Sequence, residues 1–106
     1  YLDNDLWLRT ARHANRLAAQ LGAGLETLSG VRLAWPVEAN EVSVILPRDL
    51  DARLRAAGAR YHGWQGRARP EGGIDDAREV LVRLVTSGAM EESAVTRLIE
   101  AAAQTP

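Results

Sequence analysis

The sequence predicts an α+β fold, in which a small antiparallel-type sheet of three to four strands carries helices on one face. Apolar residues recur first at helical and then at strand spacing, in the order helix, strand, strand, helix, strand, strand, helix. The connections between these segments are short, which favours antiparallel neighbours. The chain has 106 residues, of which 46 % are hydrophobic, so it fits one domain with a modest core.

The first predicted element is a long amphipathic helix. Its apolar stripe consists of Trp7, Ala11, Ala14, Ala18, Leu21, Leu25 and Leu28. Asp3, Asn4 and Asp5 precede the stripe and are expected to cap the helix. Gly22 and Gly24 weaken it near its end, and Gly30 is a candidate stop, so we expect the helix to break early.

The middle of the chain predicts two strands and a short helix. Residues 31–35 alternate between apolar and other side chains and end before Pro36. Residues 42–46 are almost continuously apolar, which is typical of a central strand. Residues 48–57 have helical spacing, and Gly58 stands where a left-handed cap is usually found.

The last third predicts two more strands and a final helix. Tyr61, His62 and Trp64 mark a short strand, and residues 65–76 are rich in glycine, proline and charge, which indicates a loop or turn. Residues 79–86 are apolar apart from a single central charge, so we expect a strand that is covered on both faces. Glu91 and Glu92 open the last helix, whose apolar stripe is Val95, Leu98, Ile99 and Ala102.

The composition argues against several classes of function. A net charge of -1 provides no field that would attract nucleic acid. No stretch has the length of a membrane span, and the acidic first residues do not suit a secretory or transit peptide, so we expect a cytoplasmic protein. The absence of cysteine and the presence of only two histidines leave no metal site and no thiol chemistry to expect. All 13 basic residues are arginine, so no side-chain amine is available for a Schiff base.

Four segments in order carry a resemblance to a known family. They are residues 6–15 (LWLRTARHAN), 36–42 (PVEANEV), 58–64 (GARYHGW) and 82–87 (VRLVTS). Together they resemble the carboxy-terminal region of the low-specificity threonine aldolases, which are fold-type I pyridoxal-phosphate enzymes of the aspartate-aminotransferase-like superfamily.

The resemblance implies that residues 1–106 are the carboxy-terminal small domain of a longer, homo-oligomeric lyase. A start within a helix pattern at Tyr1, with Met90 as the only methionine, fits that expectation. A large domain outside this chain would hold pyridoxal phosphate and its lysine, and the whole enzyme would cleave β-hydroxy-α-amino acids to glycine and an aldehyde. The chain alone would then not be catalytic, and it would carry no catalytic, cofactor-binding or metal-binding residue.

Arg83 is the one predicted site residue. In the family, the arginine of this strand motif binds the α-carboxylate of the substrate. A planar guanidinium suits that task because it holds a carboxylate through two parallel hydrogen bonds. From the residues alone, a structural salt bridge or a snorkelling side chain is the favoured reading of a charge among Val82 and Leu84, and the resemblance shifts the preference to the functional role.

The other polar candidates have simpler structural interpretations. We expect His13 to be a solvated or interface residue, His62 to pack on an aromatic neighbour, and Asn40 to bond its own backbone in a turn. Of the acidic pairs, Asp3 with Asp5 predicts a helix cap and Asp75 with Asp76 a solvated loop. Trp7, Trp35 and Trp64 are expected in the core, and any that is exposed would mark an interface.

The sequence departs from the family after Ser87. Gly88, Ala89 and Met90 replace an aromatic residue and a capping threonine, so we expect looser packing of the cleft and a weaker cap on the last helix. Two other functions stay open. One is a noncatalytic packing or oligomerisation domain that dimerises through the stripe from Trp7 to Leu28, and the other is a pyridoxal-phosphate enzyme with β-elimination or transamination activity.

Overall fold

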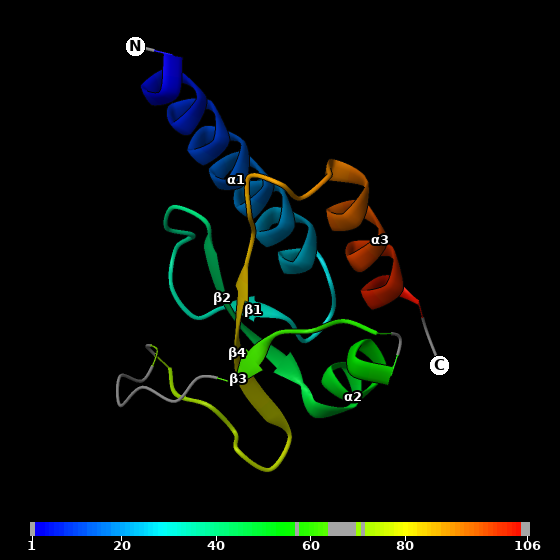
Figure 1. Cartoon of the computed structure of the whole chain (residues 1–106). Coiled ribbons are helices and arrows are strands. Elements are labelled where there is room, and N and C mark those ends of the chain that lie inside the picture. The colour runs from blue at the N-terminus through cyan, green and yellow to red at the C-terminus, as the bar shows by residue number, and fades with distance from the viewer. Residues whose placement is uncertain (1, 57, 64–69, 71, 105–106) are drawn as a thin grey trace.

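Seven elements follow one another in the predicted order (Figure 1). They are seen in a computed structural model, which describes residues 2–56, 58–63, 70 and 72–104, with side chains from residue 5 onward. The elements are α1 (Leu2–Glu26), β1 (Arg32–Leu33), β2 (Glu41–Pro47), α2 (Arg48–Ala56), β3 (His62–Gly63), β4 (Glu79–Val85) and α3 (Glu92–Ala103).

The strands form one antiparallel sheet in the order β1-β2-β4-β3. The two central strands pair along their whole length, from Glu41 opposite Val85 to Pro47 opposite Glu79. The first predicted strand is shorter than expected, since β1 has only 2 residues. Ala34 still donates its N–H to the carbonyl of Ser43 at 2.8 Å, after which Pro36, which has no N–H, cannot extend the pairing.

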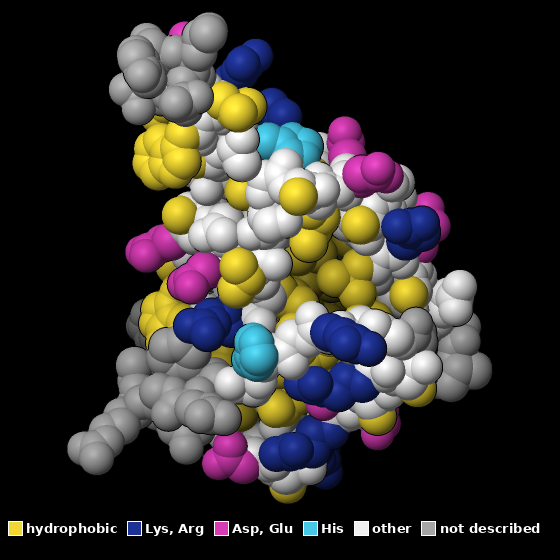
Figure 2. Space-filling model, viewed as in Figure 1, with side chains coloured by type: hydrophobic (Ala, Val, Ile, Leu, Met, Phe, Trp, Pro, Cys, Tyr) yellow, Lys and Arg dark blue, Asp and Glu magenta, His cyan; other side chains and the backbone are white. Residues whose placement is uncertain are grey.

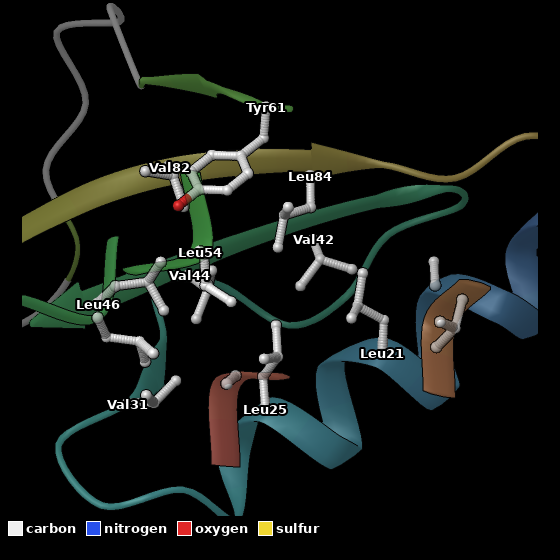
Figure 3. Packing of buried hydrophobic residues seen from close by; sticks show 14 of the residues in the cluster. Leu21, Leu25, Val31, Val42, Val44, Leu46, Leu54, Tyr61, Val82 and Leu84 are labelled. Carbon is white, nitrogen blue, oxygen red and sulfur yellow. The ribbon is translucent and has the colours of Figure 1, made fainter. Parts of the chain in front are cut away.

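All three helices contribute to one core on a single face of the sheet, which confirms the predicted α+β architecture. The buried core residues are Leu17, Ala18, Leu21 and Leu25 of α1, Val42, Val44 and Leu46 of β2, Leu50 and Leu54 of α2, Val82 and Leu84 of β4, and Val95 and Ala102 of α3, with Val31 and Tyr61 from connecting segments. Figure 3 shows Leu21 and Leu25 pointing from α1 toward Val42 and Val44. Alternation along each strand places every second side chain in this layer.

The opposite face of the sheet is covered only in part. Ile45 is fully buried, whereas Val85 at the end of β4 is 48 % exposed. The prediction that β4 is covered on both faces is therefore wrong for its last residues. Next to the start of β4, Arg32 donates hydrogen bonds of 2.7 Å to Glu79 and to the carbonyl of Gly73. The N–H of Asp75, and next the Arg32 guanidinium, lower the pKa of the Glu79 carboxyl.

Two predictions about α1 are also wrong. The helix already includes Asp3 to Asp5, so these residues do not stand before its first turn, and it continues to Glu26 instead of breaking early. Close packing explains why the glycines are tolerated. A Cβ atom at Gly22 would lie 2.6 Å from a methyl group of Val37, and one at Gly24 would lie 2.4 Å from the terminal methyl of Ile99. Gly30 has a φ of 78° and lies in the turn beyond the helix.

The ends of the other helices agree with the sequence. Gly58 has a φ of 101°, as expected for a left-handed cap, and the next N–H, of Ala59, donates to the carbonyl of Leu54 at 3.0 Å. Glu91 caps α3 without a side-chain capping hydrogen bond, which is the weak cap that residues 88–90 predicted. Of the described helices, none combines the length and the apolar character that a membrane span requires.

Candidate functional site

Arg83 lies in the middle of β4, on the face of the sheet opposite the helices. Its neighbours across the sheet are Ser43 on β2 and His62 on β3. The Arg83 side chain is 40 % exposed, and its Nη1 atom lies 3.8 Å from Oε1 of Glu41, a carboxylate that is itself 50 % exposed. This separation is longer than a hydrogen bond, and exposed ion pairs are weak. The guanidinium is therefore loosely held and accessible.

Thr86 fixes the end of β4 close to Arg83. It is 1 % exposed, and its hydroxyl donates to the carbonyl of Ala14 on α1 at 2.6 Å. Its N–H donates to the carbonyl of Asn40 at 2.9 Å, and the Asn40 side-chain amide donates to the Thr86 carbonyl at 2.8 Å. The prediction that Asn40 bonds its own backbone is therefore wrong, because its amide donates to Thr86, the residue directly after β4. These bonds tie the strand both to α1 and to the segment that leads into β2.

An open groove of about 510 Å³ lies beside Arg83. We call it the basic groove, and its lining residues are Arg55, Ala59, Arg60, Tyr61, His62, Arg83 and Val85. Three of these residues are arginines and one is a histidine, and none of the described lining residues is acidic. Figure 2 shows basic side chains gathered on this part of the surface. The groove therefore presents positive charge on a chain whose net charge is -1.

A polar cluster at the edge of the groove links α2 to β3. The Tyr61 hydroxyl donates to Oδ1 of Asp51 at 2.5 Å, and Nε of Arg55 donates to the same oxygen at 3.0 Å. The Arg55 guanidinium also lies 4.2 Å from the centre of the Tyr61 ring. Burial raises the pKa of the Tyr61 hydroxyl well above its usual range, and the neighbouring Asp51 carboxylate raises it further. Asp51 pairs with Arg55, and Glu41 lies loosely beside Arg83, so Arg60 is the groove arginine without an acidic partner among the described residues.

A second, more apolar hollow of about 610 Å³ adjoins the basic groove and shares Ala59, Arg60 and Tyr61 with it. It lies between α2 and α3, and its apolar lining includes Leu54, Leu98 and Met90. The recess with a hydrophobic floor is visible in Figure 2. Met90, one of the residues that depart from the family pattern, thus lies in the wall of a surface hollow.

The histidines are placed differently from each other. His13 is half-buried: its Nε2 donates to the carbonyl of Met90 at 2.8 Å, and its Nδ1 accepts from Arg16 at 3.1 Å. It joins α1 to the segment before α3, which is a structural role and not a solvated one. His62 is exposed and lines the basic groove. We predicted that His62 packs on an aromatic neighbour; of its two such neighbours Tyr61 is buried, whereas Trp64 lies outside the described residues.

The remaining candidates agree in part with the predictions. Asp75 is exposed, and its carboxylate accepts the N–H of Ala77 at 3.2 Å, as expected for a solvated loop. Trp7 is 69 % exposed, so it is not the core residue that the helical stripe predicted, and Trp35 is half-buried. Across the residues that the structure describes, there is no group of three or more histidine or acidic side chains that could hold a metal ion.

Sequence reasoning did not single out Arg55, Arg60 or Tyr61 as residues of the groove. Arg60 and Tyr61 stand between Gly58 and the middle of the short strand that was predicted. A usable signal was the alternation itself, since a buried aromatic residue between Arg60 and His62 places those two on a common side of an extended segment.

The sheet, the helices on one face and the basic groove on the other define a small α+β domain that places an accessible arginine on its open face. Two curated relatives are low-specificity L-threonine aldolases. The protein from Pseudomonas aeruginosa is 43 % identical and that from a Pseudomonas species 37 % identical, each over 65 residues, which are 61 % of this chain and 19 % of the relative. The chain therefore matches about a fifth of their length. No family model matches the chain.

Solved structures give the same answer for the fold. A threonine aldolase from Leishmania major superposes with a TM-score of 0.65 and 34 % identity, over 85 % of this chain and 23 % of that one. The 4-hydroxyphenylacetaldehyde synthase of Rhodiola rosea superposes with a TM-score of 0.63 over 88 % of this chain and 22 % of its own, and at 22 % identity it supports the fold alone. The resemblance to threonine aldolases that the sequence predicted is confirmed for this segment.

Proposed function

We propose that this chain is the carboxy-terminal small domain of a pyridoxal-phosphate-dependent lyase that cleaves β-hydroxy-α-amino acids to glycine and an aldehyde. The proposal assigns binding of the substrate α-carboxylate to Arg83. The observation that carries it is the placement of Arg83: a guanidinium with 40 % of its side chain exposed stands on the open face of the sheet, in a segment similar to threonine aldolases.

The geometry suits carboxylate binding. Arg83 lies on a strand that pairs with two others. Among the described residues its acidic partner is Glu41, at 3.8 Å, which a substrate carboxylate in better geometry would readily displace. Two parallel hydrogen bonds from a guanidinium fix both the position and the plane of a carboxylate. Holding that end of the substrate sets the direction of the bond between its α- and β-carbons, which is the bond to be broken.

The residues of this chain do not fit covalent attachment of the cofactor. The chain contains no lysine, so none of its side chains can form a Schiff base with pyridoxal phosphate. When bound, that cofactor supplies an electron sink for the cleaved bond. In our proposal it is held by a large domain outside this chain, the chain alone is inactive, and the full-length protein is a cytoplasmic homo-oligomer.

The test is to substitute Arg83 in the full-length protein and to assay threonine cleavage. We expect Arg83→Gln to lower kcat/KM about 100-fold, mainly through KM, because a charge-assisted bidentate contact is lost. Arg83→Lys should recover part of the loss, since it keeps the charge without the planar fork. Arg78→Gln is the matched control, because Arg78 is an exposed arginine whose side chain is 87 % accessible and does not line the groove.

The products decide between the proposed reaction and its alternatives. Aldol cleavage of threonine releases glycine and acetaldehyde, whereas β-elimination releases ammonia and a 2-oxo acid, and transamination consumes an acceptor oxo acid. The proposal is overturned if Arg83→Gln changes kcat/KM less than twofold, or if the reading frame upstream of Tyr1 encodes no lysine-bearing domain.

A noncatalytic packing role is favoured by one observation, the exposure of Leu6, Trp7 and Leu8 at the start of α1. The rest of the predicted dimer stripe is not available, because Ala14, Ala18, Leu21 and Leu25 are buried inside the fold. Only the first turns of α1 could serve such a role. Sedimentation of the full-length protein over a range of concentrations tests it, since dimers that survive Trp7→Glu would exclude this surface.

A further inference from the structure

The basic groove holds more positive charge than one carboxylate needs. Arg83 is matched loosely by Glu41, and Arg55 is matched by Asp51 at 3.0 Å. Arg60, by contrast, has no ion pair within the described part of the chain, although it lines the same groove. Positive groups that converge without acids attract anions and disfavour neutral ligands. A single α-carboxylate at Arg83 would leave the charge of Arg60 unused.

The backbone places His62 and Arg60 beside Arg83. His62 and Arg83 are direct partners across β3 and β4, and side chains so paired lie on the same face of a sheet, with Cβ atoms about 5 Å apart. Tyr61 is buried while Arg60 and His62 on either side of it are exposed, as expected for an extended segment with alternating side chains. Arg60, His62 and Arg83 therefore project on the same side of this edge.

The edge is held rigidly enough to define a site. Tyr61 is anchored by its hydrogen bond to Asp51, and its carbonyl accepts a hydrogen bond of 3.1 Å from Arg55. These contacts fasten the segment between Arg60 and His62 to α2. Fixed donors lose less conformational freedom on binding than free surface side chains do.

We infer that Arg60 and His62 form a second anion-binding subsite next to Arg83, so that the basic groove accepts a molecule with two acidic groups. Arg60 provides a permanent charge and a planar fork of donors, and the His62 ring provides a further N–H. The identity of the first group, an α-carboxylate at Arg83, rests on the proposed function. On that basis the substrate class is β-hydroxy-α-amino acids whose side chain ends in a carboxylate or another acidic group.

The binding test uses the full-length protein and two simple probes, acetate with one carboxylate and succinate with two, titrated by calorimetry at constant ionic strength. We expect succinate to bind about tenfold more tightly than acetate, because only succinate reaches both subsites. Arg60→Gln should remove most of that advantage and leave acetate binding within twofold, and His62→Gln should remove a smaller part. Arg83→Gln should weaken both probes.

Matched controls separate this site from general surface charge. Arg78→Gln removes an equal charge away from the groove and should change neither affinity. Circular dichroism checks that the variants, at exposed or half-buried positions, keep their fold. The subsite is refuted if acetate and succinate bind equally to the unaltered protein, or if Arg60→Gln and Arg78→Gln weaken succinate to the same extent.

A kinetic comparison keeps this inference apart from the proposed function. If the protein cleaves threonine but Arg60→Gln does not change its preference between threonine and 3-hydroxyaspartate, the second subsite is wrong and the aldolase proposal stands. If succinate binding depends on Arg60 while no aldol cleavage occurs, the aldolase proposal is wrong and the two-anion groove stands.

Discussion

The side chains around the basic groove differ most in how strongly each is held. Arg55 stacks on Tyr61 and is paired with Asp51, so its charge serves structure. Arg83 faces Glu41 across 3.8 Å, a distance that leaves both groups largely hydrated. Arg55 is thus held in place, whereas Arg83 is free to bind a ligand. The difference comes from the acidic partner of each arginine, because both carry the same charge.

Tyr61→Phe is expected to lower stability in a way that depends on pH. At neutral pH the variant loses the hydrogen bond to Asp51, and bonds to charged groups contribute about 1.5 kcal/mol. The pKa of Tyr61 is raised in the folded state, so its stabilising contribution is complete below the ordinary value of 10.0 and is lost as the pH rises above it.

Urea denaturation of the full-length protein and its Tyr61→Phe variant, at pH 7 and at pH 11, checks this expectation. The difference in free energy of unfolding should shrink at the higher pH, because only the unaltered protein has a hydroxyl whose ionisation favours unfolding. An unchanged difference at both pH values would show that folding does not raise the pKa of Tyr61.

At the scale of elements, the close approach of α1 and α3 depends on Gly24. In an open helix, replacing glycine by alanine adds about 1 kcal/mol of stability. Here we expect Gly24→Ala to destabilise the protein by about 1 to 2 kcal/mol, because the new methyl group would lie 2.4 Å from the end of Ile99 and crowd the packed helices. Thermal or chemical denaturation measures the change.

A double-mutant cycle identifies the cause of that change. In an Ile99→Ala background the space is open, so Gly24→Ala should there become neutral or stabilising. Equal effects of Gly24→Ala in the two backgrounds would mean that contact with Ile99 is not what forbids the side chain.

The order of the elements could be predicted from the sequence because each has its own periodicity. The strand β2, the cap at Gly58 and the stripe of α3 are local patterns, and the structure confirms them. The early break of α1 was wrong because propensity ignores what packs against a glycine. The cover on the end of β4 was wrong for the same reason, since Val85 has the composition of a core residue but no described neighbour over it.

The residues of the candidate site likewise include some that local sequence patterns predict and some that they do not. Arg83 was accessible to sequence reasoning because it is a single charge in an apolar strand. Arg60 became part of the groove only through the pairing of β3 with β4, which joins segments about twenty residues apart. The Thr86 hydroxyl that holds α1 depends on a contact 72 residues away along the chain, and no local pattern signals it.

At the scale of the molecule, the beginning of α1 projects from the body of the domain (Figure 1). Leu6, Trp7 and Leu8 there are 59 %, 69 % and 41 % exposed. An aromatic side chain such as that of Trp7 buries roughly 150 to 250 Å² of surface when it is covered. Exposed apolar residues that lie next to one another commonly mark a contact surface. If the chain is the carboxy-terminal domain proposed above, the projecting end is a surface on which the large domain would pack.

Trp7→Glu tests that expectation. In the full-length protein we expect a loss of about 2 to 4 kcal/mol or a clear fall in Tm, because a charge would be placed in a buried contact. In the isolated chain the same change should stay within about 0.5 kcal/mol, since the side chain there faces solvent. Calorimetry measures the effect of Trp7→Glu in the full-length protein and in the isolated chain. Equal effects in both would show that Trp7 is not part of a contact with the rest of the protein.

Within the described residues, the two outermost strands of the sheet, β1 and β3, have 2 residues each. A long unpaired strand offers a row of free amide and carbonyl groups to another polypeptide, and such rows initiate fibrous aggregation. Here each border provides too few of these groups to template a further strand. Short outer strands therefore lower the tendency of this sheet to add a strand from another copy of the chain.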